Sequence, residues 1–251
     1  TFLLLLGYAK VYFHLPYRQT EGIAQGHAKG KVPSIPDYTT ISRRINRLDI
    51  KIQDKSKEFE DDYMVIAIDS TGIKVTNRGQ WMREKWNVKK KRYLKIHIAT
   101  NVKTKEILSM KVTDEHVHDS KVLPELVENI IKSNNITATI VKILTDGAYE
   151  GNDIFRYLAD NGILPCIKLR KNARIKLKTN HILRNLSVIS QRNDLQKWKD
   201  SIVIYGKRWI VETVFSSIKR TFGEHVYSVK FENMVKEMML KTALYNKIIF
   251  I

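Results

Sequence analysis

Three acidic residues stand where carboxylates can do chemistry. Asp69 ends the apolar run VIAIDSTG, and Asp146 ends a second apolar run, KILTDGAYEG. Glu212 is an acid among many bases in the stretch YGKRWIVETVFSSIKR. A carboxylate at the end of a buried strand is costly to desolvate unless it is paired, hydrogen-bonded or bound to a cation. Three such groups in one place would hold a hard divalent cation, either Mg²⁺ or Mn²⁺.

Each acid by itself also has a simpler explanation. An aspartate before Ser-Thr-Gly or before glycine, as at Asp69 and Asp146, is common turn chemistry. Glu212 can be a member of helical ion pairs on a solvated face. The metal interpretation therefore depends on a fold that brings the acids together. Two ions held roughly 3.5–4 Å apart can activate a water or a 3′-hydroxyl and stabilise the leaving oxygen of a phosphodiester.

The charge balance points to a polyanionic partner. The chain has 251 residues, with 44 Lys and Arg against 26 Asp and Glu, which gives a formal net charge of +18. Nucleic acid is the first expectation for such a charge, and an anionic membrane surface is the second. The single cysteine, Cys166, excludes an intrachain disulfide and a thiolate metal cluster, and it fits a reducing cytoplasmic setting.

The first residues are apolar, but they form a short segment. Lys10 interrupts the run TFLLLLGYAKVYFHLPYR, which is shorter than the roughly 20 apolar residues of a membrane span. The run therefore predicts a buried helix, and we expect no membrane partner. Because the first residue is threonine, we expect the natural start of the protein to be missing.

The elements that must position the acids begin after a helical N-terminal region, residues 1–50. A proline-rich turn there leads to an N-cap at Asp37 and a helix that carries Arg43 and Arg44. Two short helices across a turn, the second basic, indicate a helix-turn-helix that binds DNA, although an ordinary helical hairpin with a charged face fits equally. Residues 51–62 are highly charged and predict a linker.

Residues 63–251 predict a mixed α/β sheet with helices on its faces. The segments YMVIAIDST, RYLKIHIAT and KEILSMKVT read as three strands, followed by a helix, a strand, a helix and a strand. A basic, irregular stretch and a last helix come next. This order is that of the ribonuclease-H-like fold, in which the first and fourth strands are neighbours. Asp69 and Asp146 should then lie side by side, and the last helix would add Glu212.

The last helix has a polar stripe beside its apolar face. Its apolar residues recur at three- and four-residue steps. If the helix already runs from residue 205, then Tyr205, Arg208, Glu212 and Lys219 fall on one neighbouring arc.

In these motifs the chain resembles the DDE transposases of bacterial and archaeal insertion sequences. It is most similar to the insertion-sequence four/five-like branch, whose third acid lies in the pattern Y-x2-R-x3-E-x6-K. That pattern is matched at every spacing by Tyr205, Arg208, Glu212 and Lys219. AIDST and TDGAY, with Tyr149, resemble the family's other two motifs, and LPYRQTEGI and PDYTTISRR resemble its N-terminal helical region.

The resemblance implies a function for each of these residues. Asp69, Asp146 and Glu212 would be the catalytic triad and the metal ligands. Arg208 and Lys219 would contact DNA near the cleavage site.

By the same resemblance, Tyr205 would help to position the DNA strand. The substrates would be the terminal inverted repeats of the element and a target DNA, cleaved and joined by a homodimer. Two alternatives remain: a nuclease of the same fold without strand transfer, and an inactive transposase-derived DNA-binding protein.

Two basic stretches are further candidates for DNA contact. Residues 78–95 interleave tryptophans with lysines and arginines, and we expect Trp81, Lys89 and Lys90 to contact DNA, rather than to form a solvated hairpin arm. Residues 168–178 form a second basic run between the second and third acids.

The histidines and the cysteine favour structural roles. His116 and His118 fit helix capping and turn chemistry better than a zinc site, because no fourth ligand is evident. His97 alternates within a predicted strand, and Cys166 reads as a core residue.

Overall fold

The computed structural model describes most of the chain. The described residues are 2–52, 62–75, 93–133, 138–176, 182–202 and 205–249. They form two compact units. The first unit comprises Thr1–Asp54, Ile73–Leu94 and Ser216–Ile251, and the second comprises Lys55–Gly72 and Lys95–Phe215.

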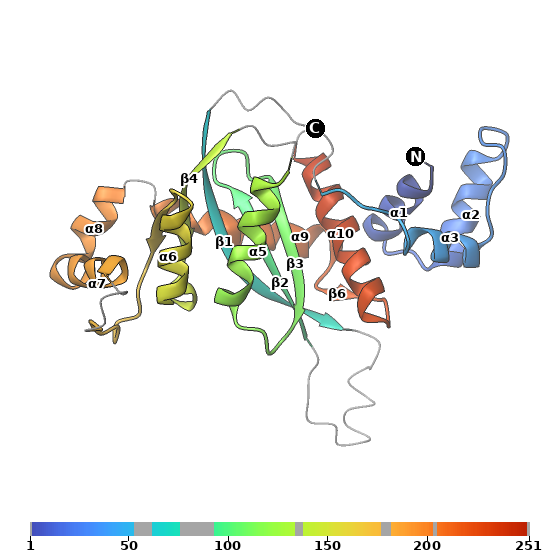
Figure 1. The fold of residues 1–251 in the computed structure, drawn as a ribbon. Coiled ribbons are helices and arrows are strands. Elements are labelled where there is room, and N and C mark those ends of the chain that lie inside the picture. Colours follow the sequence, from blue (N-terminus) through green and yellow to red (C-terminus); the bar gives the residue numbers. More distant parts are fainter. Residues whose placement is uncertain are drawn as a thin grey trace, which may run out of the picture. The chain divides into compact units, whose positions relative to one another are not determined.

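The described strands and helices follow one another along the chain (Figure 1). The strands are β1 (Tyr63–Val75), β2 (Tyr93–Asn101), β3 (Ile107–Asp114), β4 (Thr139–Thr145), β5 (Leu164–Ile167) and β6 (His225–Val226). The helices are α1 (Phe2–Tyr12), α2 (Tyr17–Ala28), α3 (Tyr38–Ile45), α5 (Asp119–Ile131), α6 (Asn152–Asp160), α7 (Ile182–Asn193), α8 (Leu195–Ile202), α9 (Trp209–Phe222) and α10 (Phe231–Ile248). Two 3-10 helices are η1 (Gly147–Tyr149) and η3 (Tyr205–Arg208).

The sheet has the predicted mixed topology. Its strand order is β3-β2-β1-β4-β5, and β6 pairs with β1. β1 and β4 are parallel, as are β4 and β5. β2 and β3 are joined by a tight turn closed by the hydrogen bond from Asn101 N to Glu106 O, at 2.9 Å, and such a short connection joins antiparallel strands. The predicted neighbourhood of the first and fourth strands is therefore confirmed.

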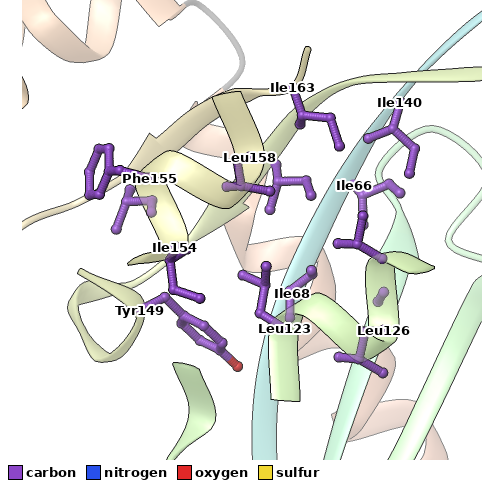
Figure 2. Close-up of a cluster of buried hydrophobic side chains, with 14 of the residues drawn as sticks. Ile66, Ile68, Leu123, Leu126, Ile140, Tyr149, Ile154, Phe155, Leu158 and Ile163 are labelled. Carbon is purple, nitrogen blue, oxygen red and sulfur yellow. The ribbon is translucent and has the colours of Figure 1, made fainter. Parts of the chain in front are cut away.

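The core of the second unit lies between the sheet and two helices. The inward side chains Ile66 and Ile68 of β1 pack with Leu123 and Leu126 of α5 and with Leu158 of α6 (Figure 2). In Figure 1, α5 lies across the face of the strands β1, β2 and β3. The alternation of apolar residues along β1 thus fixes which face meets the helices, and its odd-numbered residues, Asp69 among them, belong to the opposite face.

The core of the first unit is built from helices. Ile41 and Ile45 of α3 pack with Leu6 of α1 and with Leu240 and Ala243 of α10. α3 begins at the predicted cap: the side chain of Asp37 accepts hydrogen bonds from the backbone N–H groups of two following threonines. α2 and α3 contact one another, as expected for two short helices across a turn.

Several elements differ from the sequence-based expectation. The stretch between β5 and the last predicted helix is not irregular throughout, because α7 and α8 form there. The predicted last helix begins at Trp209 rather than at Tyr205, since residues 205–208 form η3. β6 and α10 follow it and were not predicted.

Some predictions fall on residues outside the described ranges. Trp81, Lys89 and Lys90 lie within residues 76–92, and most of the predicted linker lies within residues 53–61. The DNA contact of these residues and the division of the chain at the linker stay predictions. Among the described residues, no helix combines the length and apolar character that crossing a membrane requires.

Candidate active site

Asp69 on β1 and Asp146, directly after β4, lie at equivalent positions relative to the pairing of these two strands. The parallel register of β1 and β4 pairs Ala67 with Leu144. Each acid follows its paired residue by two positions, so the two carboxylates leave neighbouring strands at the same level. The prediction that Asp69 ends its strand is wrong, because β1 continues to Val75 and its last residues pair with β6.

The Asp69 carboxylate is largely shielded from solvent. Its Oδ1 accepts a hydrogen bond from Ser70 N at 2.8 Å. The pKa of Asp69 is raised to about 6, mainly by burial; the nearby carboxylates of Asp146 and Glu212 also raise this pKa, while the Ser70 N–H and the Arg208 guanidinium lower it. Asp69 therefore lies within electrostatic reach of both other acids, and the role of the three as metal ligands stays a prediction.

Asp146 is held by the turn that follows β4. Its Oδ1 accepts a hydrogen bond from Ala148 N at 2.8 Å, so it is the N-cap of η1. Gly147 in this turn lies against the chain leaving β5: a Cβ there would lie 2.9 Å from Arg170 Cγ and 3.2 Å from Lys168 O. Only glycine fits without displacing these neighbours, so the TDGAY motif has a steric reason at its third residue.

Glu212 joins the acids through Arg208. Arg208 Nη2 donates to Glu212 Oε1 at 2.5 Å, and Arg208 Nη1 lies 3.4 Å from Asp69 Oδ2. The Glu212 side chain is 55% exposed, in the first turn of α9. The guanidinium therefore bridges an acid of the sheet and an acid of the helix, and the ion pair expected for Glu212 alone is present as well.

Tyr205 differs from its predicted place on a polar helical stripe. It is buried in η3, and its hydroxyl donates to Thr145 O at 3.4 Å. Its ring lies 5.0 Å from that of Trp198 between centroids. Burial raises the pKa of Tyr205 to about 12, so the phenol stays protonated. In this arrangement the Tyr205 hydroxyl contacts the backbone immediately before Asp146.

The remaining predicted DNA contacts belong to the first unit. Lys219 is half-buried in the last turn of α9, seven residues after Glu212 on the same helix. Arg43 and Arg44 are exposed in the last turn of α3.

The structure adds one residue that sequence reasoning missed. Trp209 begins α9 between Arg208 and Glu212, and it is 55% exposed. An exposed tryptophan is unusual for a side chain of this size. The sequence indicated this exposure, because Trp209 directly follows Arg208 and does not lie on the apolar face of the predicted helix.

The histidine and cysteine predictions agree with the structure. The His118 side chain accepts from Ser120 N at the start of α5, so it is a helix cap. His97 is fully buried on β2, and Cys166 is buried on β5.

The three acids are chemically suited to bind a divalent cation, but their side chains are not arranged around a common metal position. Carboxylate oxygens are the donors that Mg²⁺ and Mn²⁺ prefer. No group of three His, Cys, Asp or Glu within the described part of the chain is arranged to hold a metal ion. The guanidinium of Arg208 stands between Asp69 and Glu212 instead, so a cation already compensates the two acids.

Comparison with known proteins identifies similar sequences and structures. Residues 60–247 match a family model described as "Transposase DDE domain", and residues 1–78 match a second model with the same description. Among solved structures, the chain is similar to the "Drosophila P element transposase strand transfer complex", at 15% sequence identity and a TM-score of 0.34. That similarity covers 96% of this chain and 63% of the other, so the chain spans less than two thirds of its length.

Proposed function

Because this chain belongs to the transposase DDE domain family, a family of DNA-cleaving and strand-transferring enzymes, we propose that it mobilises an insertion sequence. It binds the terminal inverted repeats, cleaves the DNA at the element boundary and transfers the freed 3′-hydroxyl into target DNA. The observation that supports this best is the placement of Asp69 and Asp146 on paired strands, with Arg208 linking Asp69 to Glu212. The pattern from Tyr205 to Lys219 favours the insertion-sequence four/five-like branch.

In this proposal Asp69, Asp146 and Glu212 hold two divalent cations, Mg²⁺ or Mn²⁺. Cations held there would supply activation of the attacking hydroxyl and stabilisation of the leaving oxygen of the phosphodiester. The protein's part is to present carboxylate oxygens from two rigid strands and one helix. The strand acids have fixed backbones, whereas Glu212 is exposed and adjusts its position from the helix.

Arg208 has two partners in the proposed cycle. Without a cation, its guanidinium neutralises Asp69 and Glu212. With DNA and a cation bound, it turns to a phosphate oxygen, for which the planar guanidinium is well suited. The exchange removes a competing positive charge from the acids at the moment when the substrate brings negative charge.

The net charge of +18 supports a DNA partner for the rest of the protein. Lys219, Arg43 and Arg44 are proposed to contact DNA phosphates. Tyr205 is proposed to hold the protein backbone at the end of β4, directly before Asp146. Trp81, Lys89 and Lys90 are proposed to contact DNA as well. A homodimer acts on the paired element ends, in the cytoplasm and on the nucleoid.

A gel assay tests this function and separates it from the two alternatives. A labelled duplex that contains the element's terminal repeat is incubated with Mg²⁺, Mn²⁺ or EDTA, with and without an unlabelled target. We expect metal-dependent nicking at the repeat boundary and joined products with the target. Nicking without joining would indicate a nuclease, and specific binding without nicking in any metal would indicate an inactive DNA-binding protein.

The matched variants are Asp69→Asn and Asp153→Asn. Asp69→Asn should abolish nicking while DNA binding persists, because only the metal ligand is lost. Asp153 is an exposed acid of α6 paired with Arg156, so its variant should cleave as the wild type does. Retained Mg²⁺-dependent nicking in Asp69→Asn would contradict the assignment of the acids.

A further inference from the structure

Tyr149 has a buried hydroxyl whose presence needs a reason. The residue is 1% exposed and packs in the core of the second unit. Its hydroxyl has no hydrogen-bond partner among the described residues. A buried hydroxyl left without a partner costs about 1–3 kcal/mol. A phenylalanine would fill the same space without that cost, so packing alone does not account for a tyrosine.

The hydroxyl of Tyr149 is influenced by carboxylates as well as surrounded by the apolar cluster. Figure 2 shows the ring beside Ile154, with its oxygen at the margin of the cluster of apolar side chains. Burial raises the pKa of Tyr149, and the carboxylates of Asp119, Asp69 and Asp146 raise it further, in that order. The hydroxyl therefore keeps its proton, and the acceptors within electrostatic reach are three carboxylates.

Asp119 begins α5, the helix that η1 contacts. Its Oδ1 lies 2.7 Å from Lys95 Nζ. The same oxygen lies 3.3 Å from His97 Nδ1, and His97 Nε2 is 2.9 Å from Thr113 Oγ1. Lys95 and His97 of β2 thus lie beside this carboxylate, whose Oδ1 makes no hydrogen bond among the described residues.

Tyr149 is also part of the turn that holds Asp146. Its backbone N donates to Asp146 O at 3.2 Å, and η1 packs against α5. The side chain of Asp146 caps the same three-residue helix through Ala148 N. Any force that fixes the Tyr149 ring therefore fixes the short turn from which the Asp146 carboxylate projects.

We propose that Tyr149 is a positioning residue for Asp146: its hydroxyl donates through one bridging water to the Asp119 carboxylate, whose Oδ1 is also buried without a hydrogen-bond partner among the described residues. The contact ties η1 to α5 and sets the direction in which Asp146 offers its oxygens to a divalent cation. This inference rests on the proposed function, because it gives Tyr149 a role in cation binding. Supporting residues of this kind typically affect metal affinity by about tenfold or more.

The experiment measures Mn²⁺ binding to the purified protein without DNA, by the loss of the free-ion signal in electron paramagnetic resonance. We expect Tyr149→Phe to weaken Mn²⁺ binding by about tenfold. Its melting temperature in EDTA should stay equal to that of the wild type or rise, because no direct hydrogen bond is lost. Asp119→Asn should weaken Mn²⁺ binding in the same direction.

Tyr157→Phe is the matched control. Tyr157 lies on α6, and its hydroxyl donates to Pro124 O of α5 at 3.2 Å. Its removal should lower the melting temperature and leave Mn²⁺ affinity unchanged. A merely structural Tyr149 would share one result with Tyr157: its replacement by phenylalanine would leave Mn²⁺ affinity unchanged.

Two outcomes separate failure of this inference from failure of the proposed function. If the wild type and Tyr149→Phe bind Mn²⁺ equally while Asp69→Asn loses binding, the positioning role is overturned and the metal site stands. If the wild type binds no Mn²⁺ under conditions in which it is folded, the proposed metal site is overturned, and the role of Tyr149 falls with it.

Discussion

Arg208 Nη1 lies 3.4 Å from Asp69 Oδ2, although 139 residues separate the two in sequence. The same guanidinium holds Glu212, so it stands where a cation shared by the two acids would be placed. A side chain with a permanent positive charge there competes with a metal ion for the same oxygens. Removal of the Arg208 side chain should therefore change both metal binding and DNA cleavage.

Arg208→Ala should bind Mn²⁺ more tightly and cleave DNA less well. Removal of the competing charge should raise Mn²⁺ affinity by about threefold, in line with the modest strength of partly exposed ion pairs. Cleavage at saturating Mn²⁺ should fall, because the proposed phosphate contact is lost. Mn²⁺ titration and single-turnover nicking measure the two effects. Arg156→Ala, which removes an exposed arginine of α6, should change neither of them, and weaker Mn²⁺ binding in Arg208→Ala would contradict the competition.

Asp69→Asn should stabilise the metal-free protein at neutral and alkaline pH. The pKa of Asp69 is raised from 3.8 to about 6, so the folded state holds a proton that the unfolded state releases between these values. Stability therefore falls as pH rises through this window, by roughly 1–3 kcal/mol. Asparagine removes the ionisation, so urea unfolding in EDTA should show a more stable variant at pH 8 and little difference below pH 4. Equal stability of the variant and the wild type at pH 8 would indicate that burial does not raise the pKa of Asp69.

His97 should have the opposite effect on the pH profile. The pKa of His97 is lowered from 6.5 to about 4, mainly by burial. The Asp119 carboxylate raises this pKa, and the Lys95 ammonium lowers it. The unfolded state therefore takes up a proton first, and stability is lost as pH falls through this window, by up to about 3 kcal/mol. Unfolding of wild type and His97→Asn between pH 7 and pH 4.5 should show a shallower acid slope in the variant. Parallel slopes would assign the acid sensitivity to other groups.

Trp209 should contribute to DNA binding by stacking. It is exposed next to Arg208 and Glu212, and stacking of one base on an aromatic side chain is worth about 1–3 kcal/mol. Trp209→Ala should weaken binding of an end duplex with a single-stranded overhang, whereas Trp209→Phe should retain most of the affinity, as measured by fluorescence anisotropy. Leu186→Ala, at an exposed apolar residue of α7, is the control. Equal binding by Trp209→Ala and the control would exclude stacking.

The elements that position the strand acids were predictable from sequence, and the later helices were not. The strands read clearly because their apolar runs are buried and end close to turn residues. α10 was missed because its buried face includes Glu237, Lys241 and Asn246, which pair or hydrogen-bond inside and hide the helical pattern. In α7 the reverse holds: Leu186 is exposed while Arg184 is buried.

The proximity of the two aspartates in the candidate site was predictable from sequence, but the side chains that contact the acids were not. The strand order alone brings Asp69 beside Asp146, and that order follows from the sequence of element types. The bridge through Arg208 depends on η3, a short tight turn without a periodic pattern. The Asp119 carboxylate reaches Lys95 and His97 only because α5 packs across β2, which no local pattern reveals.

The parallel pairing of β1 with β4 also has a consequence during synthesis on the ribosome. β2, β3 and α5 are synthesised before β4, so they emerge before β4 can pair with β1, and the helix with Glu212 emerges later still. Pairings between distant segments form slowly and only once the intervening chain is available. A nascent chain in which α9 has not yet emerged thus lacks Glu212, so under the proposed function its set of three acids would still be incomplete.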